Sequence, residues 1–329
     1  MRQPFRRLPV VFAVTALAAV VDASAATIAH EDIARPEGSR HYIVVRPDGA
    51  GAGKLPAIVL LHGHGASAAW LAGQADFAGY RTDQFVRFAD RAHVLLLIPD
   101  GVPASDGKRA WNDCRADAGT NSTADDVGFI GALIDEAARR HGADADRVYA
   151  YGQSNGGAMV YRLGIEIAPR LAAIGVQSAL MPAQSRCAQP THPLPVFITH
   201  GTADQIAPYA GGKVSHWALR DRGSGVSVDQ SVAIWRNLAG LPAQASAVYR
   251  FPHLHADDAT SATRYVWGTA ADGLQVELLR IDGGGHTGPT TSGPMPWLLR
   301  KLVGEMNHDV ELTDELWAFF RTKRRNDKP

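Results

Sequence analysis

The chain has 329 residues and a balanced charge, with 33 lysines and arginines against 33 aspartates and glutamates. Nucleic-acid-binding proteins carry a basic excess, so this balance argues against a nucleic-acid partner. A hydrophobic fraction of 46% with 20% charged residues excludes a largely disordered chain and predicts a globular protein with a substantial core.

The N-terminal 25 residues have the pattern of a secretory signal peptide. Three arginines among the first seven residues precede an apolar stretch, 8–21, and a small-residue cleavage site, 23–25. The apolar stretch is short for a membrane span, and no second long apolar run follows, so we expect no stable membrane insertion. An uncleaved membrane anchor is the alternative. Cleavage after Ala25 would release residues 26–329 into an extracellular or periplasmic compartment.

Strands and helices alternate along the rest of the chain. Short aliphatic runs bounded by turn residues predict strands, and apolar residues at helical spacing predict helices. In chain order the expected elements are strands at 41–45, 57–61 and 94–98, a polar loop at 101–122, a helix from a capping-box-like start at Thr123 and Asp126, a strand at 148–151, a helix at 155–167, strands at 173–177 and 196–199, a helix at 228–238, a strand at 276–281 and a closing helix at 313–324.

This alternation predicts an α/β fold with a mostly parallel central sheet and helices on both faces. No repeat, linker or low-complexity segment marks a second domain, so we expect residues 26–329 to form one catalytic domain. Ligands of such sheets bind at the carboxyl ends of the strands. The loops that follow the strands are therefore where the functional residues are expected.

The two cysteines, Cys114 and Cys187, are expected to form a disulfide. Export to an oxidising compartment favours a disulfide over a thiol catalyst, and two thiols alone rarely hold zinc. Two buried free thiols are the alternative.

A candidate nucleophile follows the predicted strand at 148–151. Residues 152–156 read G-Q-S-N-G, a G-x-S-x-G motif that leads directly into a predicted helix. In that context the glycines let the backbone turn sharply and hold the hydroxyl of Ser154 above the sheet. The alternative is a glycine-rich turn with an incidental serine.

A serine nucleophile needs a base and a carboxylate that orients the base. Asp204 and His286 each follow a later predicted strand, which gives the order Ser, Asp, His that is typical of α/β-hydrolases. We expect Asp204 as the acid and His286 as the base, although a turn-capping aspartate and a surface histidine are the alternatives. Asp100 and Asp282 also follow strands, and either could be the acid instead.

Two backbone amides should stabilise the oxyanion that forms when the serine attacks a carbonyl. One is the amide of Asn155, directly after the nucleophile. The other should come from the loop 62–65, which reads H-G-H-G and resembles the oxyanion loop of esterases. The backbone of His64 or Gly65 is the expected second donor.

The same histidines allow a metal-site interpretation. His62 and His64, together with His253 and His255, could begin a zinc site, but no aspartate follows His64 at the spacing that zinc hydrolases use. A non-catalytic binding protein on a hydrolase scaffold is a further alternative. The triad interpretation implies no cofactor and no metal.

One aromatic residue and two acidic residues near the motifs also have expected roles. Trp111 lies in the polar loop after a strand, where we expect it to line the substrate cleft; packing beneath its own loop is the alternative. Asp125 and Asp126 are expected to begin a helix, because carboxylates suit helix N-termini.

Taken together, these motifs resemble secreted esterases grouped as polyhydroxybutyrate depolymerase-like and feruloyl esterase-like proteins, over about residues 40–325. The matching segments are 61–63, 111–112, 125–127, 152–157, 200–204 and 284–286. The resemblance implies an α/β-hydrolase fold with Ser154 as nucleophile, Asp204 as acid and His286 as base. It also supports the disulfide, since members often carry cysteines before the strand that leads to the acid.

The resemblance implies a secreted, monomeric carboxylic-ester hydrolase that acts on a small ester or an ester-decorated polymer. Polyester depolymerases of this group usually add a substrate-binding domain, and the absence of one here favours soluble esters, with a polyester depolymerase as the alternative. The sequence departs from the family at Gly288, where an aromatic residue commonly stands near the base. One wall of the acyl pocket is therefore expected to be missing or supplied elsewhere.

Overall fold

The computed structural model describes residues 26–51, 53–77, 79–215, 221–271, 273–293 and 295–325. The predicted signal peptide, 1–25, lies outside these residues. No helix in the described ranges is long and apolar enough to cross a membrane.

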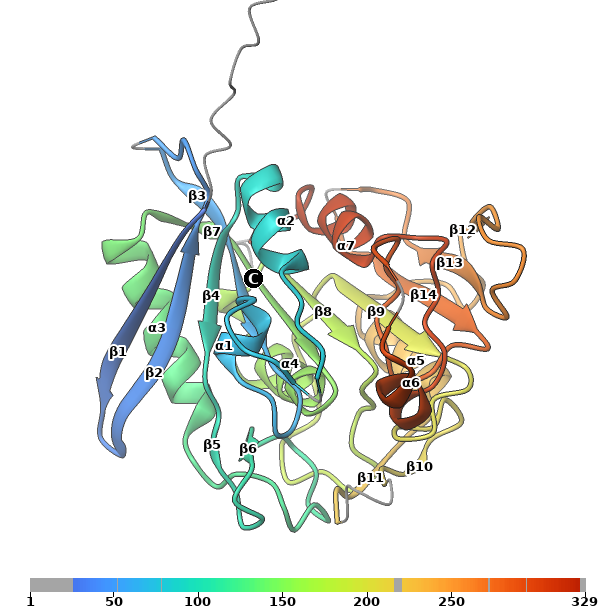
Figure 1. Ribbon diagram of the computed structural model, residues 1–329, viewed down its shortest axis with the longest axis horizontal. Helices are drawn as coiled ribbons and strands as arrows, with labels where there is room; N and C mark the ends of the chain where they lie inside the picture. The colour runs from blue at the N-terminus through green and yellow to red at the C-terminus, as the bar shows by residue number, and fades with distance from the viewer. Residues whose placement is uncertain are drawn as a thin grey trace, which may run out of the picture.

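A ten-stranded sheet forms the centre of the molecule, in the order β1-β2-β4-β3-β7-β8-β9-β14-β13-β12 (Figure 1). Its strands are β1 (Thr27–Arg35), β2 (Gly38–Arg46), β3 (Leu55–Leu61), β4 (Leu95–Pro99), β7 (Ala143–Gln153), β8 (Ala173–Gln177), β9 (Val196–Gly201), β12 (Ala247–Arg250), β13 (Ser261–Trp267) and β14 (Val276–Asp282). The strands from β4 to β14 pair in parallel, while β1 and β2 at one edge and β12 and β13 at the other pair antiparallel. The predicted mostly parallel sheet is confirmed.

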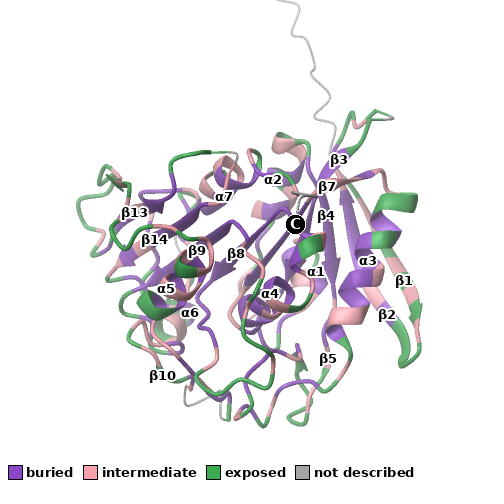
Figure 2. Ribbon diagram, turned by 180° about the vertical axis from the view of Figure 1, so that it is seen from behind, coloured by how far each residue is buried: buried purple, intermediate pink, exposed green. Residues whose placement is uncertain are grey.

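Helices cover both faces of the sheet, as predicted. The helices are α1 (Ala68–Leu71), α2 (Gln84–Ala92), α3 (Asp126–Arg140), α4 (Asn155–Glu166), α5 (Val228–Leu238), α6 (Trp297–Val303) and α7 (Leu312–Phe320), with a 3-10 turn at Ala168–Arg170. Helices α1, α2 and α7 lie on one face, and α3, α4 and α5 lie on the other (Figures 1 and 2). Two short strand pairs, β5 (Val102–Pro103) with β6 (Arg109–Ala110) and β10 (Gly212–Lys213) with β11 (Ser224–Gly225), lie in the loops beyond the carboxyl ends of the sheet.

The N-cap of helix α3 lies two positions after the predicted one. Asp125, not Thr123, is its N-cap, and the Asp125 carboxylate accepts a hydrogen bond of 2.9 Å from the amide of Gly128. The predicted role of Asp125 at a helix start is therefore confirmed. Asp126 is the first residue of the helix, and its buried carboxylate accepts a hydrogen bond of 2.7 Å from the Arg40 guanidinium.

The core consists of two apolar layers, one on each face of the sheet. Strand β3 shows how they arise, because its side chains alternate between the faces. Leu55, Val59 and Leu61 belong to the layer under α3 and α4, whereas Ile58 and Leu60 belong to the layer under α2 and α7. Every residue of β3 is buried, and Figure 2 shows the same burial along the central strands. A sheet buried on both faces requires the continuous apolar runs by which these strands were predicted.

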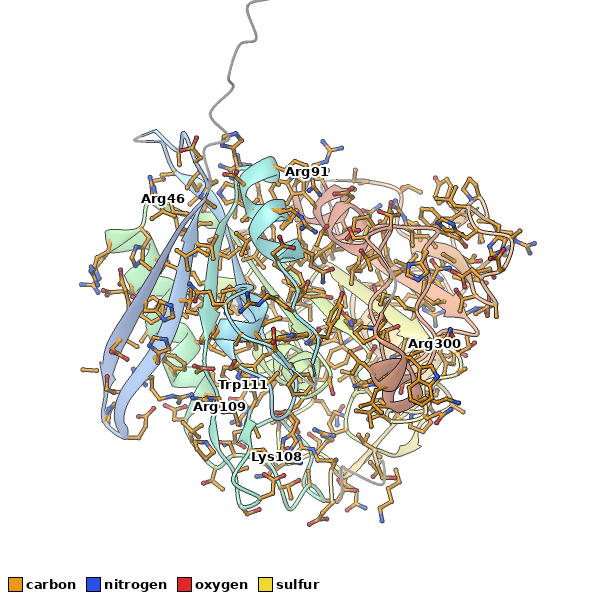
Figure 3. The ribbon with its side chains drawn as sticks, viewed as in Figure 1. Arg46, Arg91, Lys108, Arg109, Trp111 and Arg300 are labelled. Atoms are coloured by element: carbon orange, nitrogen blue, oxygen red, sulfur yellow. A yellow bond between two sulfur atoms is a disulfide. The ribbon has the colours of Figure 1, made fainter. Side chains whose placement is uncertain are left out.

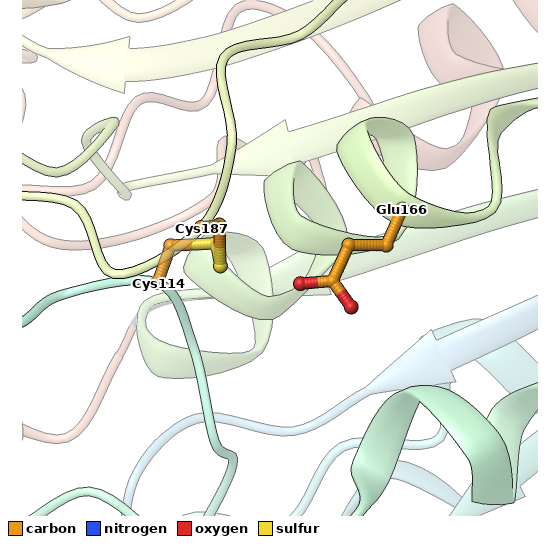
Figure 4. Close-up of side chains that lie close together, drawn as sticks. All are labelled: Cys114, Glu166 and Cys187. Carbon is orange, nitrogen blue, oxygen red and sulfur yellow. A yellow bond between two sulfur atoms is a disulfide. The ribbon is translucent and has the colours of Figure 1, made fainter.

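The predicted disulfide is confirmed: Cys114 and Cys187 are bonded, with 73 positions between them in the sequence (Figure 4). Glu166 lies beside the bond, and these three residues form the only group of three potential metal ligands in the described ranges. Both cysteines are in the disulfide, so this group offers no thiolate to a metal.

Replacing both cysteines by serine is expected to lower the free energy of unfolding by about 2–4 kcal/mol, because the bond restricts the unfolded chain over a long loop. Urea unfolding of the double variant and of the wild type checks this value. Wild-type protein unfolded in the presence of a thiol reductant is the control and should match the variant. An unchanged midpoint in both would contradict the expectation.

Candidate active site

Ser154 lies at the turn between β7 and α4, at the carboxyl edge of the sheet. Its backbone is strained, with φ 55° and ψ −122°, and its amide donates to the Gln177 carbonyl at 2.9 Å. Non-glycine residues rarely adopt a positive φ, and such strain concentrates at functional sites. This conformation is typical of a nucleophile elbow, which holds a serine hydroxyl clear of the sheet.

The glycines on either side of Ser154 are required by close packing of the backbone. A Cβ atom on Gly156 would lie 2.4 Å from the Leu61 carbonyl oxygen, and one on Gly152 would lie 2.4 Å from the Gly156 carbonyl oxygen. Neither position has room for a side chain. The motif glycines thus let α4 start directly against the end of β3.

A buried polar network fixes the residue after the nucleophile. The Asn155 side chain accepts from the Trp111 amide at 2.7 Å and donates to the Asp113 carboxylate at 2.8 Å. Asp113 also receives the Arg115 guanidinium. Burial alone would raise the pKa of Asp113, but the Arg115 charge and hydrogen bonds hold it below its usual range. The hydrogen bonds of the Asn155 side chain therefore also hold its backbone amide in place.

Trp111 does not line a substrate cleft, so this prediction is wrong. Its side chain is fully buried, and its indole N–H donates to the His62 carbonyl at 2.9 Å. Figure 3 places it at the same edge of the molecule as Lys108 and Arg109. The loop folds back so that the indole packs on the His62 ring, with the ring centres 5.0 Å apart. The indole thus holds the loop 62–65, and the Trp111 backbone holds the Asn155 side chain.

Asp204 and His286 are hydrogen bonded, with 2.7 Å between the Asp204 Oδ2 and the His286 Nδ1. The other carboxylate oxygen of Asp204 accepts the amides of Ile206 and Ala207, each at 2.8 Å. Burial alone would raise the pKa of Asp204, but the charge of His286 and hydrogen bonds from His200 and His286 hold it well below its usual range. Asp204 is thus ionised and oriented toward His286.

The two alternative acids have other partners. Asp100 accepts the Ala68 amide at 2.8 Å, at the start of α1. Asp282 pairs with Arg280 at 3.0 Å. Among the described contacts, the carboxylate that reaches the His286 ring is that of Asp204.

Ser154 and His286 line the same groove, which has a volume of about 390 Å³. Its walls are largely apolar. The apolar side chains that line it belong to Trp70, Phe77, Tyr80, Ile206, Met295, Leu299, Leu302, Val303 and Met306. A hydroxyl and an imidazole in one apolar groove form a typical enzyme site.

The aromatic side chains of this groove were not among the predicted site residues. Trp70, Phe77 and Tyr80 line it, and the signal for them was three aromatic residues close together after the oxyanion loop. Gly288 also lines the groove, and a Cβ atom there would lie 2.7 Å from a methyl carbon of Leu312. Trp70, Phe77 and Tyr80 therefore give aromatic surface to the same groove that Gly288 lines.

Of the two predicted oxyanion donors in the loop 62–65, the geometry favours His64. The amide of Gly65 donates to the Arg109 carbonyl at 2.8 Å and is therefore occupied. The amide of His64 donates to no backbone oxygen among the described residues. Asn155 begins α4, and the first amides of a helix have no partner within it. Both amides thus remain available for an oxygen bound near Ser154.

The zinc-site alternative does not fit the donor set. The His62 Nε2 accepts the Gly101 amide at 3.0 Å, and its Nδ1 lies 2.7 Å from the Gly63 carbonyl, so both ring nitrogens are used within the fold. His253 is engaged with Asp309 at 3.2 Å. None of the four histidines belongs to a group of three potential ligands in the described ranges.

Burial lowers the pKa of His62 and of His64 to about 4 in each case. Between pH 6.5 and 4 the unfolded chain therefore takes up protons that the folded protein does not. The free energy of unfolding is expected to fall over this range by up to about 1.4 kcal/mol per pH unit for each histidine. Urea unfolding at pH 7, 5.5 and 4.5 measures this slope.

The variant His64→Gln should flatten that slope by roughly half, since the glutamine does not titrate and retains a donor for Asp106. An unfolding midpoint that is independent of pH in the wild type would contradict the expectation.

Several known proteins are similar to this chain in sequence or in fold. A family model described as phospholipase/carboxylesterase matches residues 44–232, more than half of the chain. A protein of Nocardia uniformis subsp. tsuyamanensis named "Putative esterase NocK" is 28% identical over 270 residues, covering 79% of this chain and 72% of its own length. Feruloyl esterase B of Piromyces equi is 25% identical over 210 residues, covering 62% of this chain; the match spans 35% of that relative.

Among solved structures, an acetyl xylan esterase from Aspergillus awamori superposes with a TM-score of 0.55 at 14% identity, covering 89% of this chain and 99% of the other. At that identity the likeness shows a shared fold.

Proposed function

The chain belongs to the phospholipase/carboxylesterase family, and on that premise we propose that it is a serine carboxylesterase whose catalytic triad is Ser154, Asp204 and His286. The observation that carries the proposal is the 2.7 Å bond from His286 to Asp204, with His286 and Ser154 on the wall of one groove. The predicted α/β-hydrolase fold, which the family and the solved relative share, is confirmed.

The proposed mechanism is two-step acyl transfer. The carboxylate of Asp204 accepts a hydrogen bond from the Nδ1–H of His286, which fixes the ring proton on Nδ1 and leaves Nε2 free to take the Ser154 proton. Ser154 attacks the ester carbonyl, and the amides of His64 and Asn155 stabilise the oxyanion. His286 then protonates the leaving alcohol, and a water molecule hydrolyses the acyl-enzyme by the same steps in reverse. This chemistry requires no cofactor.

The apolar groove favours as substrate an ester with a bulky apolar or aromatic group. Relatives named feruloyl esterase and acetylxylan esterase suggest esters of plant cell-wall polymers, and soluble 3-hydroxybutyrate oligomers are the second substrate class. We propose that residues 26–329 act as one exported, monomeric catalytic domain after cleavage following Ala25. N-terminal sequencing of the exported protein and light scattering of the purified protein test these two points.

An alkyl fluorophosphonate tests the nucleophile directly, because it phosphonylates activated serines. The expected result is one adduct per chain on the peptide that contains Ser154, together with loss of methyl ferulate and 3-hydroxybutyrate oligomer hydrolysis. Heat-unfolded protein is the control and should not react. An adduct on another residue, or hydrolysis that survives full labelling, would refute the assignment.

A further inference from the structure

His200, near the end of β9, is fully buried beside the proposed catalytic acid. Its Nε2 lies 3.3 Å from the Asp204 Oδ2, which is the oxygen that bonds to His286. Two imidazoles therefore meet one carboxylate oxygen, and only that of His286 lines the groove. The proposed mechanism gives the second imidazole no role.

The Ala207 carbonyl fixes the proton of the His200 ring. The His200 Nε2 lies 2.8 Å from this oxygen, which only accepts hydrogen bonds, so the ring carries its proton on Nε2. The buried Nδ1 of His200 has no hydrogen-bond partner among the described residues. Because Nε2 is also close to Asp204, its N–H is shared between the carbonyl and the carboxylate.

Ala207 also connects His200 to the other oxygen of Asp204. The Ala207 amide donates to the Asp204 Oδ1 at 2.8 Å, while the Ala207 carbonyl accepts from His200. One residue thus holds the carboxylate with its N–H and the imidazole with its C=O. The Asp204 carboxylate has donors at both oxygens and cannot rotate without losing one of them.

The other titratable groups in contact with His200 are neutral or paired. The Tyr209 ring meets the His200 ring edge-on, with the ring centres 6.0 Å apart, and burial raises the pKa of Tyr209. Arg280 stands opposite His200 in the register of β9 and β14, and it pairs with Asp282 at 3.0 Å. Among the described ion pairs, the carboxylate that His200 meets is that of Asp204.

His286 has few charged neighbours besides its partner carboxylate. Glu305 contacts the residue after His286 through its carbonyl, and its carboxylate pairs with Arg300 at 3.4 Å. His64 and Lys108 line the same groove as His286. Among the described residues, none of these four forms a hydrogen bond or an ion pair with the His286 ring.

A donor at the Asp204 Oδ2 has two consequences for His286. It holds the carboxylate in the orientation that bonds to the His286 Nδ1, and it takes up part of the negative charge that would otherwise stabilise a protonated His286. Resting on the proposed esterase function, we propose that His200 is a positioning residue of the triad, which orients the Asp204 carboxylate and makes His286 a weaker base. A weaker base stays unprotonated, and therefore active, at lower pH.

The pH dependence of kcat/KM for methyl ferulate tests this role, because its acidic limb reports protonation of the base in the free enzyme. His200→Leu replaces the imidazole by an apolar side chain. The acidic limb should move to higher pH by about half a unit to one unit, and kcat on the plateau should fall severalfold. A purely structural role would lower activity by the same factor at every pH. An acidic limb at the wild-type position would therefore overturn the proposal.

His200→Gln is the conservative variant, since the glutamine amide can place an N–H near the position of the imidazole Nε2–H. It should return the acidic limb close to its wild-type position. Thr199→Val is the matched control, because it alters the neighbouring buried residue, whose hydroxyl has no partner. A shift in the Gln variant as large as in the Leu variant, or an equal shift in the Thr199 variant, would refute the role of the N–H.

Nitrogen NMR of isotopically labelled histidines in the wild-type protein decides the matter if the Leu variant does not fold. His200 should show the Nε2–H tautomer, and its signals should shift as His286 titrates. The Nδ1–H tautomer, or signals that do not respond to His286, would contradict the proposal.

The pH profile also separates this proposal from the esterase function. If methyl ferulate is hydrolysed and the wild-type and His200→Leu proteins share one acidic limb, the esterase stands and the role of His200 fails. If no ester is hydrolysed above a Ser154→Ala blank, both proposals fail.

Discussion

Ser154→Ala is expected to lower kcat for ester hydrolysis by about 10⁵-fold while the protein remains folded. In the proposed mechanism the Ser154 hydroxyl forms the acyl-enzyme. Ser178 also has a positive φ, 49°, and lines the groove, but Ser154 is the serine at the turn between β7 and α4. Alanine tolerates the same backbone conformation about as well as serine, so the thermal midpoint should change little.

Initial rates on methyl ferulate and a thermal melt measure the two quantities. Ser105→Ala is the matched control, since that hydroxyl only donates to the Gly119 carbonyl on the surface. Wild-type activity in the Ser154 variant would end the triad assignment.

Asp204→Asn is expected to lower kcat by about 10⁴-fold, the loss typical of a triad acid replaced by its amide. The amides of Ile206 and Ala207 both donate to one oxygen of Asp204, so the asparagine should keep its carbonyl there. Its NH₂ group then faces the His286 Nδ1. The imidazole must place its proton on Nε2 to accept this bond, and it can no longer take the Ser154 proton.

The control for this variant is Asp282→Asn, which alters a carboxylate at a strand end that pairs with Arg280. It should retain nearly full activity. The opposite pattern, with Asp282 essential and Asp204 dispensable, would move the acid to the alternative position.

The sequence predicts best those parts of the fold that are buried on both faces. Strand β8 and helix α5 match their predicted bounds, because an aliphatic run and a capped amphipathic helix carry strong local signals. The edge strands β1 and β12, and β13 next to β12, were not predicted. Strand β12 is mostly exposed, and its pairing with β13 depends on a partner outside any local window.

The residues of the candidate site also differ in how far the sequence predicted them. The nucleophile motif and the order of the acid and the base were visible because each follows a strand. The burial of Trp111 was not, because it depends on how the loop folds onto His62, 49 positions earlier.

Both described ends of the chain meet the sheet at its amino edge. Thr27 pairs with Arg46, next to the start of β4, and the Arg325 amide bonds to Asp146 near the start of β7. Figure 3 shows Arg46 at the edge opposite Trp111 and the loops of the candidate site. A solid support or fused module attached at either end would therefore sit behind the enzyme, with the groove facing outward toward a polymer in suspension.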